Sequence, residues 1–295
     1  MAIDVPRFRS DYHVSSIPGQ GIFLLTEALP TVLNGDIYEA VCPLIDGYRS
    51  AREIADTLAD VVSAAEVYYG LAKLEERGFI EEAATALDQG ISAYWRGVGQ
   101  DPEQALARLA ATPVELITLG AIDRHQTEAA LTAAGVHVAD EGSLVVAFSD
   151  DYRYLELDDI DAKMFANEGA WALVKPSGIY PWIGPFLQPA SGGCLRCLVD
   201  RINMNYMADT FVWEQSGIAP VTARAYNQAG VAAVSNLAAL ELAKWIVSGE
   251  SYLVNGLVSV SMNTMRLDRH ALTPRPQCRR CGEPDYRERR SKFRD

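Results

Sequence analysis

The sequence predicts two domains of different class, an α+β winged helix-turn-helix in residues 1–85 and an α/β domain with a structural zinc site in residues 113–295. Three observations predict this organisation. Residues 11–81 order their elements as β-β-β-α-α-α-β, the chain alternates strands with helices from Pro113 onward, and two Cys-x-x-Cys pairs lie in the second half. An alanine-rich stretch of helical character, residues 86–112, is expected to link the two domains.

In the first domain, short apolar runs separated by turn residues predict three strands, at 11–17, 21–26 and 31–33. A first helix is expected over 36–45. The second and third helices begin at Ser50 and Ser63, and each serine is followed three residues later by a glutamate, which is the pattern of a capping box. Gly78 should end the third helix before a return strand at 79–81.

The second domain is predicted to hold a mostly parallel sheet with helices on both faces, because its strands and helices alternate. We expect strands at 114–119, 136–139, 144–148, 171–175 and 179–188, and helices at 122–135, 155–168 and 227–248. A hairpin at 252–267 follows.

Four of the five cysteines form the two Cys-x-x-Cys pairs, and Cys42 is expected to be a small core residue. A two-residue gap lets both thiolates of a pair reach one metal ion from a tight turn, and two such pairs complete a closed tetrahedral zinc site. The alternative is a pair of dithiol redox motifs. The glycines and proline beside the pairs favour structural zinc, with the ligands Cys194, Cys197, Cys278 and Cys281.

Composition excludes several classes of function. The net charge of −13 argues against nucleic acid as the main partner. No apolar run is expected to approach the length of a membrane span, no signal peptide is seen, and paired cysteines without one indicate the cytosol. The last thirty residues carry ten basic and five acidic side chains, which favours either a solvated end or a contact with an acidic partner.

Nucleotide binding is disfavoured at the first strand-to-helix turn of the second domain. That turn holds one glycine, Gly120, where a dinucleotide fingerprint needs three, and Asp123 adds negative charge where a phosphate would sit. Asp150 and Asp151 follow a strand at the edge where α/β sheets bind ligands, although an aspartate capping a turn is the other interpretation. No catalytic constellation of histidine, serine or metal-binding residues is evident.

The first domain offers a candidate peptide-binding groove between its third strand and third helix. The exposed edge of Thr31, Val32 and Leu33 could accept an extended peptide by β-augmentation. On the helix, a stripe beside the core stripe would line the groove, with Gly70 leaving room for a visiting side chain. Its residues are Glu66, Tyr69, Gly70, Lys73 and Arg77. A plain solvated helix face is the alternative.

Taken together, these parts resemble the leader-peptide-binding, ThiF-like partner of YcaO-type azoline cyclodehydratases. The resemblance covers nearly the whole chain and is carried by five segments at the cysteine pairs and the strands before them, 149–152, 171–178, 182–186, 193–198 and 275–282. It implies a precursor-peptide recognition domain that clamps a leader peptide. It also implies a ThiF-like, Rossmann-like domain that uses the four cysteines for zinc and binds no nucleotide.

The implied function is recruitment of a precursor peptide to a YcaO-type cyclodehydratase, fused or separate, which converts Cys, Ser or Thr to azolines. A homodimer is also implied. Two rivals stay open. One is a ThiF-like, ATP-dependent adenylating enzyme of the microcin type, and the other is a winged-helix transcription regulator, which the acidic third helix disfavours.

Overall fold

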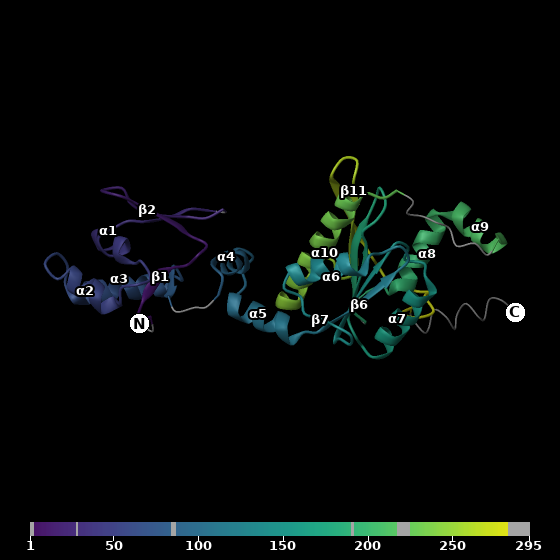
Figure 1. Cartoon of the computed structure of the whole chain (residues 1–295), viewed down its shortest axis with the longest axis horizontal. Helices are drawn as coiled ribbons and strands as arrows, with labels where there is room; N and C mark the ends of the chain where they lie inside the picture. Colours follow the sequence, from purple (N-terminus) through teal and green to yellow (C-terminus); the bar gives the residue numbers. More distant parts are fainter. Residues whose placement is uncertain (1–2, 28, 84–86, 190–191, 217–224, 283–295) are drawn as a thin grey trace. The chain divides into compact units, whose positions relative to one another are not determined.

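The computed structural model describes residues 3–27, 29–83, 87–189, 192–216 and 225–282. It divides into two compact units, Met1–Ala105 and Leu106–Asp295 (Figure 1). The division falls inside helix α5 (Pro102–Ala111), within the segment expected to link two domains. Helix α4 (Gln89–Gly97) accounts for the rest of the helical character seen there. The arginine-rich tail beyond residue 282 lies outside the described residues.

The N-terminal unit contains an antiparallel sheet in the order β2-β3-β4, followed by three helices. The strands are β2 (His13–Ile17), β3 (Gly21–Leu25) and β4 (Thr31–Leu33), and the helices are α1 (Asp36–Val41), α2 (Ala51–Thr57) and α3 (Ala64–Glu76). Strand β5 (Ile80–Glu82) pairs with β1 (Pro6–Phe8), a strand that was not predicted, in a separate two-stranded sheet. The helix expected over 36–45 ends at Val41 and continues as a single turn, η1 (Cys42–Leu44), because Pro43 has no N–H for a longer helix.

Both predicted capping boxes are present. Ser50 and Ser63 each accept a hydrogen bond from the glutamate N–H three residues on, and each glutamate carboxylate accepts one from the serine N–H. One face of α3 is fully buried, with Val67, Leu71 and Leu74 in a core that also includes Leu24 and Leu33 of the sheet. Gly78 ends the helix with a positive φ of 67°, as expected.

The C-terminal unit is built on a seven-stranded sheet in the order β12-β11-β10-β9-β8-β6-β7. The strands are β6 (Val114–Leu119), β7 (Val138–Ala139), β8 (Leu144–Ser149), β9 (Trp171–Lys175), β10 (Trp182–Leu187), β11 (Gly256–Ser261) and β12 (Arg266–Ala271). Neighbours from β7 to β9 run parallel, whereas β9 to β12 run antiparallel. The expectation of a mostly parallel sheet was therefore wrong for half of the sheet, because β10 follows β9 without the crossover helix that parallel pairing needs.

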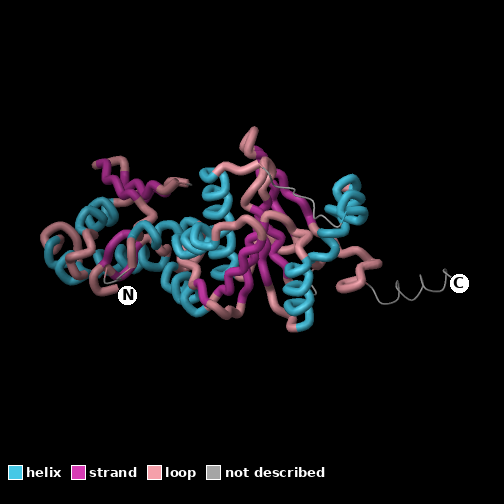
Figure 2. The backbone as a smooth tube through the Cα atoms, turned by 45° about the vertical axis from the view of Figure 1, so that its right-hand side comes forward, coloured by secondary structure: helices cyan, strands magenta, loops and turns pink. Residues whose placement is uncertain are grey.

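Helices cover both faces of this sheet (Figures 1 and 2). On one side lie α6 (Arg124–Ala133) and α10 (Gln228–Ser248), and on the other lie α7 (Leu155–Ala166) and α8 (Leu195–Asn205). Helices α8 and α9 (Met207–Ser216) were not predicted. With 21 residues and a window of mean hydropathy 1.4, α10 is by length and composition able to cross a membrane, so the prediction that no apolar run nears that length was wrong. Its Trp245 ring stacks on Phe186 of β10 with centroids 4.8 Å apart, as in a core helix of an α/β domain.

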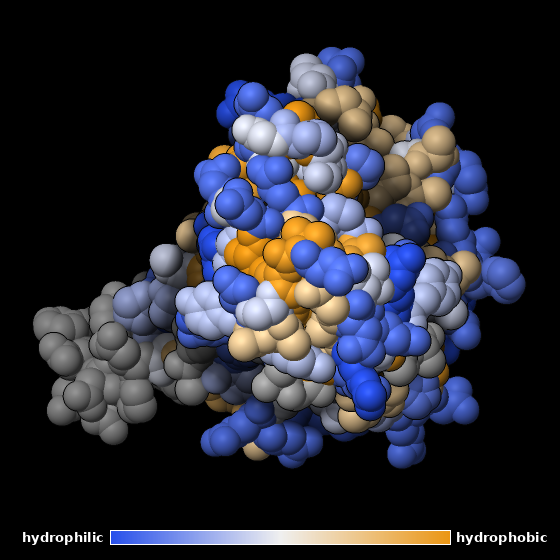
Figure 3. Space-filling view, turned by 90° about the vertical axis from the view of Figure 1, so that its left-hand side faces the viewer, coloured by the Kyte–Doolittle hydropathy of each residue, from blue (hydrophilic) through white to orange (hydrophobic). Residues whose placement is uncertain are grey.

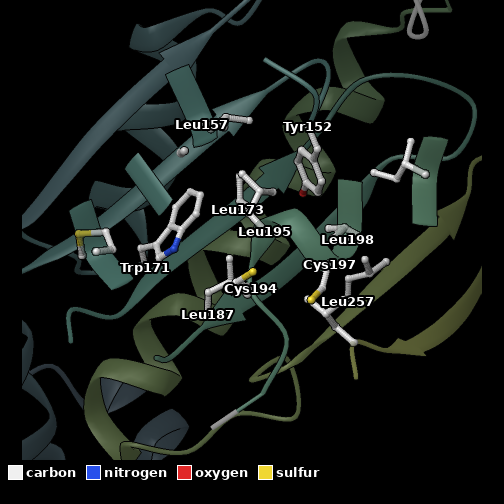
Figure 4. Close-up of a cluster of buried hydrophobic side chains, with 14 of the residues drawn as sticks. Tyr152, Leu157, Trp171, Leu173, Leu187, Cys194, Leu195, Cys197, Leu198 and Leu257 are labelled. Carbon is white, nitrogen blue, oxygen red and sulfur yellow. The ribbon is translucent and has the colours of Figure 1, made fainter. Parts of the chain in front are cut away.

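The apolar cluster between the sheet and helices α7 and α8 contains the first cysteine pair (Figure 4). Trp171, Leu173 and Leu187 of the sheet pack there with Leu195 and Leu198 of α8. Because Cys194 and Cys197 begin the same helix, burial of this apolar face also fixes where their sulfur atoms point.

Candidate functional site

Four cysteines from two distant segments form a compact cluster. The sulfur atoms of Cys194, Cys197, Cys278 and Cys281 all lie within 4.8 Å of one another. The Sγ atoms of Cys194 and Cys278 are 3.6 Å apart, and those of Cys197 and Cys281 are 3.3 Å apart. Tetrahedral zinc with Zn–S bonds of about 2.3 Å spaces its sulfurs by about 3.8 Å, so the donor set and its size fit zinc.

Local backbone structure explains how each pair turns both thiols to one side. Cys194 is the N-cap of α8 and Cys197 lies in the first turn of that helix. The second pair is in a tight turn in which the Gly282 N–H donates to the Cys278 carbonyl at 3.0 Å. A side chain at Gly282 would collide with the carbonyl oxygens of Pro276 and Cys278, so this turn requires glycine.

The thiols of Cys194, Cys197 and Cys281 have shifted pKa values. The Cys194 thiol donates to Cys197, and the Arg275 N–H donates to the same sulfur at 3.3 Å, so the pKa of Cys197 falls to about 4. Cys194 has a raised pKa because its proton holds that hydrogen bond and because it is buried, and burial raises the pKa of Cys281 to about 11. A divalent cation bound by all four would replace the remaining protons, as zinc does with thiols.

Arginines from inside both cysteine pairs tie the cluster to helix α7. Arg280 pairs with Asp158 at 3.0 Å and also with Asp161, whose side chain is 3% exposed. Arg196 pairs with the other oxygen of Asp158 at 2.7 Å. Burial raises the pKa of Asp161 and outweighs Arg280, the next largest influence. These ion pairs were not predicted from the sequence, although an arginine inside each cysteine pair was a usable signal.

The residues proposed to bind a peptide lie on two elements of the N-terminal unit. Strand β4 pairs with β3 on one side and is an edge of its sheet, and Val32 on it is 42% exposed. On α3, Tyr69 is 62% exposed and lies beneath the Lys73 ammonium, 5.9 Å from its ring centroid. Lys73 also pairs with Glu76 at 2.6 Å, and Arg77 stacks on Phe79. Glu66 is engaged in the capping box, so its carboxylate already has partners.

Gly70 does not leave open space as expected. It is buried, and a Cβ atom at this position would lie 3.0 Å from Cγ1 of Ile37 on α1. The missing side chain therefore lets α1 pack closely on α3. Helical phase put Gly70 in the stripe beside the core, whereas the structure puts it in the core stripe. Figure 3 shows apolar surface among charged side chains on the unit that carries this helix.

The turn between β6 and α6 is filled by a carboxylate. Asp150 accepts a hydrogen bond from the Ala121 N–H at 2.9 Å, and a side chain at Gly120 would collide with the same carboxylate. Backbone amides of this turn are the groups that hold phosphate in nucleotide-binding α/β domains. Asp150 thus places negative charge where a phosphate would bind. Asp150 therefore caps a turn, as the non-ligand interpretation of this residue predicted. The turn that it caps, however, precedes Asp150 in the sequence.

One serine–histidine contact was also missed. Ser259 Oγ of β11 lies 2.8 Å from His270 Nε2 of β12. Within the described residues no carboxylate is recorded on the other ring nitrogen of His270, so the pair lacks the group that orients the base in a hydrolytic triad.

Comparison with known proteins supports the fold of the first domain. The family described as a winged helix-turn-helix domain matches residues 7–82, which confirms the fold predicted for the first domain. Among functionally curated proteins, no sequence matches the chain.

Two solved heterocyclase structures are similar over 97% of this chain. A heterocyclase in complex with substrate and cofactor is 30% identical with a TM-score of 0.83. The heterocyclase TruD is 29% identical with a TM-score of 0.84. The chain spans 41% and 44% of the lengths of these two chains. MccB of E. coli is similar over 95% of this chain and 97% of its own, but at 11% identity and a TM-score of 0.58 the likeness concerns the fold alone.

Proposed function

We propose that this chain is the peptide-recognising, non-catalytic part of a heterocyclase system that modifies ribosomally made peptides. In this proposal the winged helix holds the leader of a precursor peptide. The ThiF-like α/β domain is a scaffold that presents the peptide to a YcaO-type cyclodehydratase, fused or separate, in the cytosol. The observation that carries the proposal is the likeness to two heterocyclases over 97% of the chain, one of them in complex with substrate.

The four-cysteine cluster serves this scaffold as a structural zinc site. The cysteine pairs lie 84 residues apart in the chain, so one ion would fasten the segment after β12 to the start of α8. Four thiolate ligands leave no position for a catalytic water, which makes the site a staple and not a reaction centre.

Leader binding is expected along the free edge of β4, with side chains of the leader against the exposed face of α3. Main-chain hydrogen bonds to an edge strand give affinity with little dependence on sequence, and contacts to side chains add specificity. Val32, Tyr69 and Lys73 offer an apolar, an aromatic and a cationic contact there. Gly70 belongs to the packing of α1 on α3, so an arginine at this position would disturb the fold and would not report on binding.

The test is fluorescence anisotropy with a labelled synthetic leader from the cognate precursor peptide. Wild type should bind, and Tyr69→Ala should weaken binding about tenfold, the loss that one well-placed aromatic contact typically causes. Tyr48→Ala is the matched control, because Tyr48 is an exposed tyrosine of the same unit outside the proposed face. Equal losses for both variants, or no binding by the zinc-loaded wild type, would count against the leader-binding role.

The rival role, ATP-dependent adenylation, is tested by ATP–pyrophosphate exchange in the presence of the same peptide. We expect no exchange, because the Asp150 carboxylate accepts the hydrogen bond of the Ala121 amide in the β6–α6 turn and places negative charge there. Exchange above background would make the chain an adenylating enzyme. A homodimer, which the resemblance implies, is open to measurement by light scattering.

A further inference from the structure

A large cavity opens in the C-terminal unit, and neither the four cysteines nor the residues of the β6–α6 turn line it. Its volume is about 1080 Å³, and it is lined by the ends of β8 and β9, by α8 and by the β11–β12 hairpin. The ends of parallel strands are where α/β domains bind their ligands. A cavity of this size accommodates a molecule considerably larger than a single inorganic ion.

Arg153 lines this cavity and lacks a partner for one of its nitrogens. Its side chain is 5% exposed, and Nε and Nη2 donate to Asp151 at 3.0 and 2.7 Å. Nη1 is buried and has no hydrogen-bond partner in the described residues. Buried polar groups are normally satisfied, because an unpaired donor loses its hydration without compensation. This nitrogen therefore calls for an acceptor that a bound molecule would supply.

Lys175 adds a second cation to the same cavity. Its ammonium lies 4.7 Å from the ring centroid of Trp182, and no ion pair to it is recorded in the described part of the chain. Burial lowers the pKa of Lys175, with Arg153 acting in the same direction and Asp151 and Asp150 opposing it. An anion beside the ammonium would restore the stability of its charged form.

The charge of the lining points to a monoanion. The lining holds three cationic side chains, Arg153, Lys175 and Arg201, and two carboxylates, Asp151 and Asp209, so its net charge is +1 in a chain whose total is −13. A carboxylate neutralises that charge and offers two acceptor oxygens, whereas a phosphate dianion would exceed it. Apolar side chains supply much of the rest of the wall, among them Ile179, Leu198 and Leu257 (the last two are labelled in Figure 4).

We propose that this cavity binds a carboxylate with an apolar body, its acid group held by Arg153 and Lys175 and its body against Ile179, Trp182 and Leu198. The proposal does not depend on leader binding by the N-terminal unit. It adds a small-molecule or chain-end carboxylate site to a domain to which the proposed function gives only a scaffold role.

Isothermal titration of the full, zinc-loaded chain tests the proposal with 4-phenylbutanoate and its neutral analogue 4-phenylbutanamide. We expect the acid to bind and the amide to bind at least tenfold more weakly. Lys175→Met should reduce affinity for the acid about tenfold and leave affinity for the amide nearly unchanged. Lys163→Met is the matched control, because Lys163 is exposed on α7 and does not line the cavity.

A second variant guards against a folding defect at Lys175. Ile179 is 53% exposed at the cavity, so Ile179→Asp should fold normally and weaken binding of the acid more than binding of the amide. Equal affinity for acid and amide, or equal losses from both lysine variants, would overturn the proposal. Inorganic phosphate that displaces the acid at equal concentration would also overturn it in favour of a phosphate site, as would the absence of any heat with the acid at millimolar concentration.

Discussion

The two units of this chain hold their helices in place through interactions that span very different separations in the sequence. In the N-terminal unit, α2 and α3 are fixed at their starts by capping boxes that join residues three apart. In the C-terminal unit, the start of α8 contacts cysteines 84 residues away, to which the proposed zinc ion would fasten it, and α7 is held by an arginine about 120 residues further along the chain. Local restraints of the first kind contribute little individually, whereas removal of a long-range staple releases a whole segment. The comparison therefore predicts a graded series of effects.

The largest effect is expected from Cys197→Ser. Loss of one of four ligands should abolish zinc binding, and structural zinc contributes several kcal/mol, so the melting temperature of the C-terminal unit should fall by roughly 10 °C or more. Zinc content by mass spectrometry and a calorimetric scan provide the measurement. Cys42→Ala is the control, because Cys42 is a buried cysteine outside the cluster and its variant should keep its zinc. A Cys197→Ser protein that keeps one zinc per chain would contradict the assignment.

A smaller loss of stability is expected from Arg280→Met, because this substitution leaves the buried Asp161 carboxylate without its cationic partner. Breaking a buried ion pair by removing one partner costs about 3 kcal/mol or more. The matched control is Arg196→Met, whose partner Asp158 keeps Arg280 and whose own side chain is 38% exposed.

This loss should depend on pH with a definite sign. The folded-state pKa of Asp161 is raised, so ionisation of this group disfavours the fold as pH rises through that pKa. Without Arg280, ionisation of Asp161 destabilises the folded state more strongly. The gap in melting temperature between wild type and Arg280→Met should thus narrow as pH falls, because a protonated Asp161 needs no cation. A gap that is constant with pH would mean that Arg280 acts through packing alone.

The difference in reach also explains what could be predicted from the sequence. Ser50 and Ser63 mark helix starts through the glutamate three residues after each of them, and β9 is an apolar run. Both signals are local, so these elements were predicted at the right residues. The cysteine cluster joins residues that are far apart in the sequence. Because cysteines are rare, two Cys-x-x-Cys pairs in one chain still predict that they share a site. Strand β1 was missed because it is defined by its pairing with β5, which is more than 70 residues away.

Other misses have the same cause. The antiparallel half of the large sheet follows from where β10 pairs, and the burial of Gly70 follows from which helix faces it. Neither is encoded in the residues nearby. The cavity, with one unpaired nitrogen of Arg153, forms where several segments of the chain meet, and the residues of one segment do not show that the others lie beside it.

The smallest effect is expected from Ser63→Ala, which removes the cap of α3. Loss of a serine N-cap costs about 1 kcal/mol, which is a shift of several degrees for a domain of this size. Ser16→Ala, at an exposed position of β2 in the same unit, should change stability much less.

The stabilisation by the Ser63–Glu66 capping box should also depend on pH. The hydrogen bonds from Ser63 lower the pKa of Glu66, so this stabilisation is present above the unfolded-state pKa of Glu66 and is lost as pH falls through the folded-state pKa. In Ser63→Ala, an NMR titration should find the pKa of Glu66 closer to its ordinary range. If the pKa of Glu66 were the same in Ser63→Ala as in wild type, the capping box would not persist in solution. The local restraints of the N-terminal unit would then be weaker than the comparison of the two units assumes.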